Sequence, residues 1–235
     1  MHHGKWTGTI GDIGVFSLNR HKTMQCGEGG VVITDNDRLA HRLRMVRNHG
    51  EAVLPEWVYE PIKTGNEDIV GYNYRLTELQ AAIAKPQLLR LEHLNQSRIE
   101  LADYLTEKLQ NFSFLKSPII RNNSTHVYYL YPMIYKPEIL GVSRDKFMEA
   151  MLAEGMPVSN YVRPLYRLPL YTNKFGSLDN YKPENFPNTE RCWNEAMIVT
   201  AICRPPLSTN HIDEFILAIE KIEKNSKELC CFGQI

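Results

Sequence analysis

The chain has 235 residues, of which 43% are hydrophobic, and its 27 basic and 27 acidic residues balance to a formal charge of zero. A chain of this size can bury a substantial core, and the lack of a basic surplus argues against a nucleic-acid-binding surface. No apolar stretch approaches the roughly 18 residues that span a bilayer, and the start, MHHGKWTG, lacks the apolar region of a signal peptide. We therefore expect a cytoplasmic protein that binds neither nucleic acids nor membranes. Its five cysteines form no CxxC pair, so neither a disulfide framework nor a metal site is predicted.

Two short strands are predicted near the N-terminus. Residues 13–18 and 31–34 are β-branched or aromatic runs bounded by glycine, and the loop that joins them carries Lys22. The first run has little sequence before it to pair with, although internal strands of an α/β sheet need neighbours on both edges. Either this strand lies at a sheet edge or the sequence begins in the middle of a larger fold.

A helix is predicted after the second strand, with Asp35 or Asn36 as its cap. Residues 49–74 have no clear period and contain several prolines and glycines, which predicts an extended excursion across the surface or across a partner subunit. Helical spacing returns at residue 76, where Thr77 is a plausible cap.

Pro86 lies inside this next helical pattern. Because proline removes a helical hydrogen bond and clashes with the preceding turn, we expect a break or kink near Lys85, followed by a long helix that ends near Leu109. From about Ser124 the pattern predicts a small α+β lobe. Its predicted elements are a strand at 126–135, a helix at 143–155, a strand at 156–162, and helices at 190–197 and 211–224.

Lys22 is the first candidate for chemistry. A loop lysine is most often a solvated surface charge, but this one follows an apolar strand and precedes the turn GEGG, where a backbone can approach an anionic ligand closely. A lysine held in such a site can act as a Schiff-base nucleophile, and the hydroxyl of Ser17 could bind a phosphate. GEGG alone is a weak signal, because its spacing is that of neither a P-loop nor a dinucleotide fold.

The segment GDIGVFSLNRHKTMQCGEGGVVITDN, residues 11–36, resembles the active-site segment of the DegT/DnrJ/EryC1/StrS aminotransferases, the sugar-nucleotide branch of the fold type I pyridoxal-phosphate enzymes. Lys22 follows Ser17 by five positions, and four residues separate it from GEGG. GYNYRLTELQAAI, residues 71–83, resembles the family's second signature. The segments PVSNYVRPLY and RPPLSTNHIDEFILAIEKI fit its C-terminal domain, so the resemblance covers essentially the whole chain.

The resemblance implies a role for each matching residue. Lys22 would bond covalently to the aldehyde of pyridoxal 5'-phosphate and also carry a proton during catalysis, and Ser17 would be a ligand of the cofactor phosphate. Asn73 would reach the cofactor phosphate of the neighbouring subunit, and Arg75 is a further candidate in the same segment. From the residues alone, Asn73 would instead be an ordinary turn amide.

Other candidates are His49 and Tyr161, which lie in segments that family members place near the sugar; surface placement or packing is an equal alternative for both. In related sugar dehydratases a histidine stands at the lysine position. Here the histidine is His21, one position before Lys22, so transamination is favoured over dehydration. Glu28 of GEGG is expected to shape the turn.

The function implied is a pyridoxal-phosphate-dependent transaminase that moves an amino group from glutamate or glutamine to a nucleotide-linked keto-sugar, in cell-surface polysaccharide or secondary-metabolite sugar biosynthesis. The fold implied is α/β, a partial fold type I aminotransferase. Residues 1–95 would be the C-terminal part of a mostly parallel, cofactor-binding large domain with a dimer-crossing loop. Residues 96–235 would be a connecting helix and a small α+β domain.

The family's large N-terminal portion lies outside this sequence, and it carries the aspartate that pairs with the pyridine nitrogen and an aromatic residue that stacks on the ring. The protonated nitrogen draws charge from the carbanion, so its partner matters for catalysis. The alternative is therefore a truncated, non-catalytic fragment or subunit; a homodimer or a separate chain could supply the missing half. A plain binding module would require the spacings of Ser17, Lys22, GEGG and GYNYR to be accidental.

Overall fold

The computed structural model describes residues 1–51, 69–175 and 181–231. The chain divides into two compact units, residues 1–94 with 121–126 and residues 95–120 with 127–235. Each unit buries its own cluster of apolar side chains. The functional division into a cofactor-binding part over residues 1–95 and a small domain over 96–235 stays a prediction, because compactness does not assign a role to either unit.

In the first unit, β1 (Gly14–Ser17) and β2 (Gly30–Ile33) form an antiparallel pair, with Val15 opposite Val32. The two strands predicted from the sequence are thus confirmed. Valine side chains on this ribbon are exposed, Val15 by 72% and Val32 by 45%. The mixed α/β fold holds two sheets among the described residues, and the strand pairs of both are antiparallel.

Helix α1 (Asp37–Arg47) begins at the predicted cap Asn36, whose side chain accepts a hydrogen bond from the backbone N–H of Leu39 at 3.1 Å. Of the excursion predicted over residues 49–74, residues 52–68 lie outside the described part. Helix α2 (Glu78–Leu89) begins with a capping box between Thr77 and Gln80, in agreement with the predicted cap.

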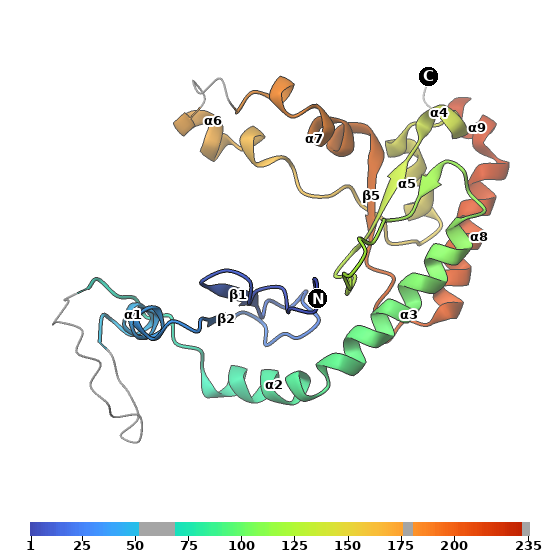
Figure 1. Cartoon of the computed structure of the whole chain (residues 1–235). Coiled ribbons are helices and arrows are strands. Elements are labelled where there is room, and N and C mark those ends of the chain that lie inside the picture. Colours follow the sequence, from blue (N-terminus) through green and yellow to red (C-terminus); the bar gives the residue numbers. More distant parts are fainter. Residues whose placement is uncertain (52–68, 176–180, 232–235) are drawn as a thin grey trace. The chain divides into compact units, whose positions relative to one another are not determined.

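Of the break or kink predicted near Lys85, the break is wrong, because α2 continues through Pro86 to Leu89. Only Arg90 separates it from α3 (Leu91–Leu109), which Figure 1 shows as the next helix in green. A proline leaves one helical carbonyl without its backbone donor. That carbonyl is the one of Ala82, and the helix continues past it; at the next carbonyl, that of Ile83, the side-chain amide of Gln87 adds a hydrogen bond of 2.9 Å.

The second unit has a three-stranded antiparallel sheet in the order β3 (Leu115–Lys116), β4 (Tyr131–Tyr135), β5 (Met197–Thr200). Alternate residues of β4 are buried, as expected for a strand with one face on a core. Helices α3, α5 (Arg144–Ala153) and α8 (Thr209–Lys224) contribute to the same core (Figure 1). A hydrogen bond of 2.8 Å from the Tyr104 hydroxyl to Asp213 links α3 with α8.

The structure confirms the two main helices of this unit, shifts the bounds of a third helix and corrects two predicted strands. The strand predicted at 126–135 begins only at Tyr131. The strand predicted at 156–162 is reduced to one bridge between Ser159 and Val199. The helix predicted at 190–197 is confirmed with shifted bounds: α7 (Pro187–Arg191) runs directly into a π-helical turn (Cys192–Ala196), and β5 begins at Met197. This strand went unpredicted because a four-residue apolar run cannot be told from the end of a helix by its period.

Short helices complete the described residues of the second unit: α4 (Pro137–Leu140), η2 (Leu165–Arg167), α6 (Pro169–Phe175), η4 (Pro183–Asn185) and α9 (Ser226–Cys231). Within the described ranges, no helix combines the length and the apolar character that crossing a membrane requires.

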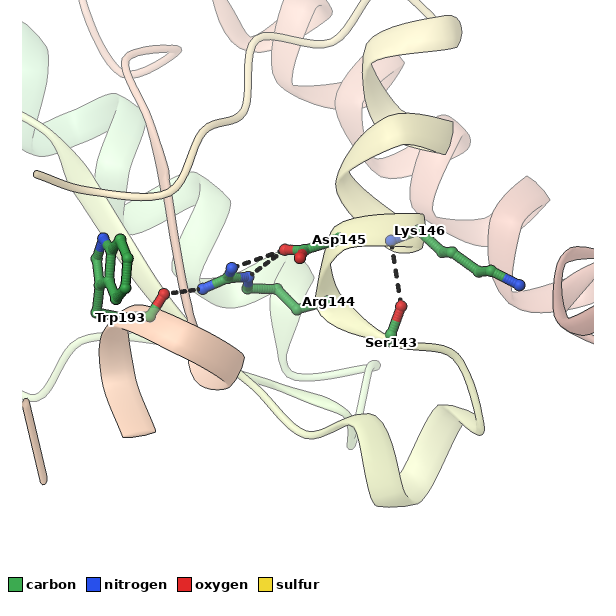
Figure 2. A network of polar contacts seen from close by, with 5 residues as sticks. All are labelled: Ser143, Arg144, Asp145, Lys146 and Trp193. Atoms are coloured by element: carbon green, nitrogen blue, oxygen red, sulfur yellow. Dashed lines mark hydrogen bonds and ion pairs between the residues drawn. The ribbon is translucent and has the colours of Figure 1, made fainter. Parts of the chain in front are cut away.

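A buried arginine joins α5 to the segment that precedes β5 (Figure 2). Arg144 is 5% exposed, and its guanidinium donates to Asp145 Oδ1 at 2.9 and 2.6 Å and also to the carbonyl oxygen of Trp193. The hydroxyl of Ser143 accepts from the backbone N–H of Lys146 and caps the helix. The first turn of α5 and the turn before β5 are thus held together by polar contacts.

Candidate functional site

Residues 18–29, which join β1 to β2, form the lysine loop. This loop brings the backbone of Lys22 and the hydroxyl of Ser17, the last residue of β1, together in one turn around Asn19. The backbone N–H of Asn19 donates to Ser17 Oγ at 3.2 Å, and its carbonyl oxygen accepts from the backbone N–H of Lys22 at 2.9 Å. The Asn19 side-chain oxygen accepts from the backbone N–H of His21 at 3.1 Å, the local contact that asparagine makes in turns. Ser17 is exposed, and Lys22 is half-buried.

Glu28 shapes this turn, as expected. Its carboxylate accepts from the side-chain amide of Asn19 at 2.7 Å across the loop. The ends of the loop are joined by two backbone bonds to Leu18, one with Gly29 at 2.9 Å and one with Cys26 at 3.0 Å. Gly27 has a φ of 86°, a conformation that a residue with a Cβ adopts only with strain. The loop is therefore closed on itself, with Lys22 near its middle.

Helix α2 holds the loop from one side. The backbone N–H of Gln25 donates to Gln87 Oε1 at 3.1 Å, and Gln87 Nε2 donates to the carbonyl oxygen of Gln25 at 2.8 Å. A third bond runs from Gln80 Nε2 to the carbonyl oxygen of Glu28 at 2.8 Å. Beneath these bonds the buried side chains of Leu18, Cys26 and Ala84 form a small core, with Met24 and Leu76 against it.

A second cluster forms where residues 71–75 return to the C-terminal end of α1. Asn73 forms an antiparallel bridge with Asn48, and the backbone N–H of His49 donates to the carbonyl oxygen of Tyr72 at 3.0 Å. Arg75 Nη1 donates to Asn48 Oδ1 at 2.7 Å. The side chains of Asn73, Arg75 and His49 are exposed.

Two glycines permit this close approach. A Cβ on Gly71 would lie 1.9 Å from the backbone nitrogen of Gly50, and a Cβ on Gly50 would lie 2.3 Å from the carbonyl oxygen of Ile69. Gly50 also has a φ of 90°, and His49 before it has a φ of 57°. The backbone there has no room for a side chain at either glycine.

The structure therefore gathers the predicted residues into two groups within the first unit. Ser17 and Lys22 share one loop, and His49, Asn73 and Arg75 share the second cluster. Leu76, directly after Arg75, packs against the small core beneath the lysine loop. Tyr161 belongs to the second unit and is 45% exposed.

Sequence reasoning missed the residues that hold the loop, namely Asn19, Gln25, Gln80 and Gln87. Asn19 carried a usable signal, because asparagine between a strand and a loop commonly bonds its own backbone. The glutamine contacts carried none, since Gln25 and Gln87 are 62 positions apart.

Comparison with known proteins then decides the family. The sequence model of the DegT/DnrJ/EryC1/StrS aminotransferase family matches residues 1–220. The chain belongs to this family. It is 30% identical to MJ1066, an uncharacterized protein of Methanocaldococcus jannaschii, over 234 residues that cover 96% of this chain and 58% of the relative.

Solved structures of the DegT/DnrJ/EryC1/StrS family resemble the chain in fold. A family aminotransferase from Brucella abortus is 25% identical with a TM-score of 0.76, and the match covers 94% of this chain and 54% of that one. DesV of S. venezuelae, solved with a ketimine intermediate, is also 25% identical with a TM-score of 0.76, covering 95% and 54%. The chain thus spans little more than half the length of these relatives, and its mixed α/β fold matches the corresponding part of the fold type I architecture.

The lysine loop fits part of pyridoxal phosphate, the cofactor implied by the resemblance. A primary amine and a hydroxyl within one turn suit the aldehyde and one phosphate oxygen of that group. The loop does not enclose a ligand by itself, because Ser17 is exposed. A pocket of about 760 Å³ in the same unit lies between β2 and α1, and neither Ser17 nor Lys22 is in its lining.

Proposed function

We propose that the chain carries the lysine-bearing part of a cytoplasmic, pyridoxal-phosphate-dependent aminotransferase that transfers an amino group from glutamate or glutamine to a nucleotide-linked keto-sugar, in polysaccharide or secondary-metabolite sugar biosynthesis. The observation that carries the proposal is the turn at Asn19, which ties the backbone of Lys22 to the hydroxyl of Ser17 in a chain of this aminotransferase family. This amine and hydroxyl are the two groups that the cofactor requires from one loop.

Lys22 Nζ would hold the cofactor covalently, and Ser17 Oγ would donate a hydrogen bond to its phosphate. When bound, pyridoxal phosphate supplies an aldehyde and an electron-withdrawing ring. Once released by the amino donor, Lys22 Nζ would move a proton at the carbon that bears the substrate's amino group. The bonds from Gln25 and Glu28 to α2 would keep the amine in place during this exchange.

Asn73 and Arg75 would serve the cofactor phosphate of a neighbouring subunit in a homodimer. Both side chains are exposed, and the backbone of residues 71–75 is held by its pairing with the end of α1. Arg75 would keep its bond to Asn48 while its remaining N–H groups face the phosphate. His49 and Tyr161 would contact the sugar.

Mass spectrometry after borohydride reduction tests the central step. We expect the chain incubated with pyridoxal phosphate and then reduced to carry one phosphopyridoxyl group, on Lys22. Lys22→Ala should lose both this adduct and the near-visible absorbance of the complex, whereas Lys85→Ala, at an exposed helical lysine, should keep both. Equal labelling of surface lysines, unchanged in Lys22→Ala, would contradict the proposal.

A second candidate function is a non-catalytic subunit completed by a separate chain. It is favoured by the apolar ribbon β1–β2, whose Val15, Phe16, Val31 and Val32 side chains are all exposed. Under this alternative, pyridoxal phosphate leaves the spectrum of the isolated chain unchanged. Cofactor attachment to Lys22 would then appear only after a polypeptide carrying the family's N-terminal portion is added.

A further inference from the structure

One segment of the second unit, residues 160–165, is held at both of its ends. At its start, Ser159 pairs with β5 through backbone hydrogen bonds of 3.0 and 2.8 Å. At its end, the side chains of Tyr166 and Arg167 in η2 both bond to Glu190 of α7. We call this stretch the tethered segment, because it runs between two fixed points.

Glu190 is the centre of the second fixed point. Its Oε1 accepts from the Tyr166 hydroxyl at 2.7 Å and from Arg167 Nε at 2.9 Å. Its Oε2 accepts from Arg167 Nη2 and from the side-chain amide of Asn194, the latter at 3.1 Å. A paired contact between a guanidinium and both oxygens of a carboxylate fixes the orientation of the two groups. The side chain of Glu190 is 15% exposed, so little water competes for these bonds.

Aromatic rings fix the same two η2 side chains along their length. The ring of Tyr166 stacks on that of Phe186, with the centroids 4.7 Å apart and the planes 16° from parallel. The guanidinium of Arg167 lies over the ring of Trp193, 5.5 Å from its centroid. Stacking and cation–π contacts of this kind favour one orientation of each side chain. The two residues that follow the tethered segment are thus held both by their polar ends and by their flat faces.

The backbone of η2 carries this constraint into the tethered segment. The backbone N–H of Arg167 donates to the carbonyl oxygen of Pro164 at 3.0 Å, and Pro164 is buried and has a φ fixed by its ring. Before Pro164 the side chains are exposed, Tyr161 by 45% and Val162 by 67%, so packing holds them only weakly. The place of Tyr161 therefore depends on the two fixed ends rather than on burial.

We propose that Glu190 is a positioning residue for Tyr161, the side chain of the second unit that would contact the sugar. Glu190 acts through Tyr166 and Arg167, because protein donors already engage both of its carboxylate oxygens. The inference rests on the proposed function for the sugar contact and adds the group that sets where this contact stands. The hydrogen bond from Arg167 lowers the pKa of Glu190 to about 2, so the carboxylate stays ionised at neutral pH.

Limited proteolysis of the full chain with chymotrypsin tests the positioning without any ligand. The peptide bond after Tyr161 is cut faster the more often the tethered segment leaves its place. We expect Glu190→Ala to accelerate this cut about tenfold or more, the fold-change typical of a lost charged hydrogen bond. The cut after Tyr129, elsewhere in the second unit, should keep its rate. Mass spectrometry of the fragments assigns each cut.

Two conservative variants grade the effect. Tyr166→Phe keeps the stack on Phe186 and loses only the hydroxyl bond, and Glu190→Gln keeps an acceptor oxygen but loses the charge. Both should be cut at rates between those of Glu190→Ala and the unmodified chain. Glu184→Ala, at an exposed carboxylate of η4, is the matched control and should be cut like the unmodified chain.

Two results of the proteolysis overturn the inference. One is an equal rate of cleavage after Tyr161 in Glu190→Ala and in the unmodified chain. The other is a parallel acceleration after Tyr161 and Tyr129, because Glu190 then supports the whole unit rather than the tethered segment.

A double-mutant cycle tests the link to the sugar, with uridine diphosphate N-acetylglucosamine as a stable nucleotide-linked probe. Calorimetric titration of the full chain should show binding that is about threefold to tenfold weaker in Tyr161→Ala and in Glu190→Ala. Because Glu190 acts through Tyr161, the double variant should bind no more weakly than Tyr161→Ala alone. Additive losses would contradict the positioning role, since independent sites add.

The two experiments separate this inference from the proposed function. Faster cleavage after Tyr161 in Glu190→Ala, without binding of the probe to the unmodified chain, would support Glu190 as the residue that positions Tyr161 and count against the sugar contact. Binding of the probe that Tyr161→Ala weakens, with cleavage unaltered in Glu190→Ala, would do the reverse.

Discussion

Gln25 and Gln87 exchange two hydrogen bonds, one in each direction, between the lysine loop and helix α2. Replacing Gln87 with methionine removes both bonds while keeping the length of the side chain. We expect hydrogen exchange at the backbone amide of Gln25 to accelerate about tenfold or more, since this N–H is partly buried and loses its acceptor.

Gln96→Met is the control for that change. Gln96 is an exposed residue of α3 whose side-chain amide donates to Glu100 in the same helix, so the lysine loop should exchange as in the unmodified chain. If Gln87→Met leaves the exchange of Gln25 unaltered, the two bonds do not hold the loop.

Gly71→Ala should disrupt the second cluster. The added Cβ would lie 1.9 Å from the backbone nitrogen of Gly50, so the two segments must separate. We expect a cost of about 1–3 kcal/mol, typical of overpacking. The measurement is hydrogen exchange at the amides of Tyr72 and Tyr74, which donate to the end of α1 at 2.8 and 3.0 Å. Gly11→Ala, where nothing lies within 4 Å of the new Cβ, should leave these amides protected.

Glu190 should make the second unit sensitive to acid. The hydrogen bonds from Arg167, and then those from Tyr166 and Asn194, lower the pKa of this carboxyl from 4.5 to about 2. Because the folded-state pKa is the lower one, the stabilisation is complete above pH 4.5 and is lost as the pH falls towards 2. Carboxyl titration by NMR checks the pKa, and thermal unfolding between these pH values checks the stability.

Glu190→Gln should remove this part of the acid dependence, whereas Glu184→Gln, at an exposed position in η4, should retain it. An acid dependence identical in Glu190→Gln and the unmodified chain would show that the contacts of Glu190 do not stabilise the fold.

Cys203 should resist alkylation. Burial raises the pKa of its thiol from 9.0 to about 12, which lowers the thiolate fraction at neutral pH about a thousandfold, and only the thiolate reacts. We expect iodoacetamide to label Cys192, which is partly exposed, well before Cys203 in the folded chain. In urea both cysteines should react. Rapid native labelling of Cys203, read by mass spectrometry, would mean that the core around it opens.

Local patterns predicted much of the fold. Strands β1 and β2, the caps Asn36 and Thr77, and the helices α5 and α8 follow from residues close together in sequence. The position of the break after α2 did not, because α2 runs through Pro86 and the loss of one backbone hydrogen bond does not decide where a helix ends. Strand β5 also went unpredicted, because its pairing with β4 joins residues more than sixty positions apart.

The candidate site, like the fold, could be predicted from the sequence only in part. Lys22, Ser17 and Asn73 could be chosen from short motifs, because each is marked by its neighbours in sequence. The residues that hold these side chains in place could not be predicted. Gln80 and Gln87 bond the lysine loop, and Arg75 bonds Asn48, only because folding brings segments that are distant in sequence together.

The ribbon β1–β2 has a practical consequence for anyone who purifies this chain. Its strands pair only with each other among the described residues, and valines on it are in contact with solvent. Free strand edges beside apolar side chains are templates for the addition of further strands. Concentrated samples should therefore aggregate through this ribbon, and a charged substitution such as Val15→Lys should keep the chain in solution.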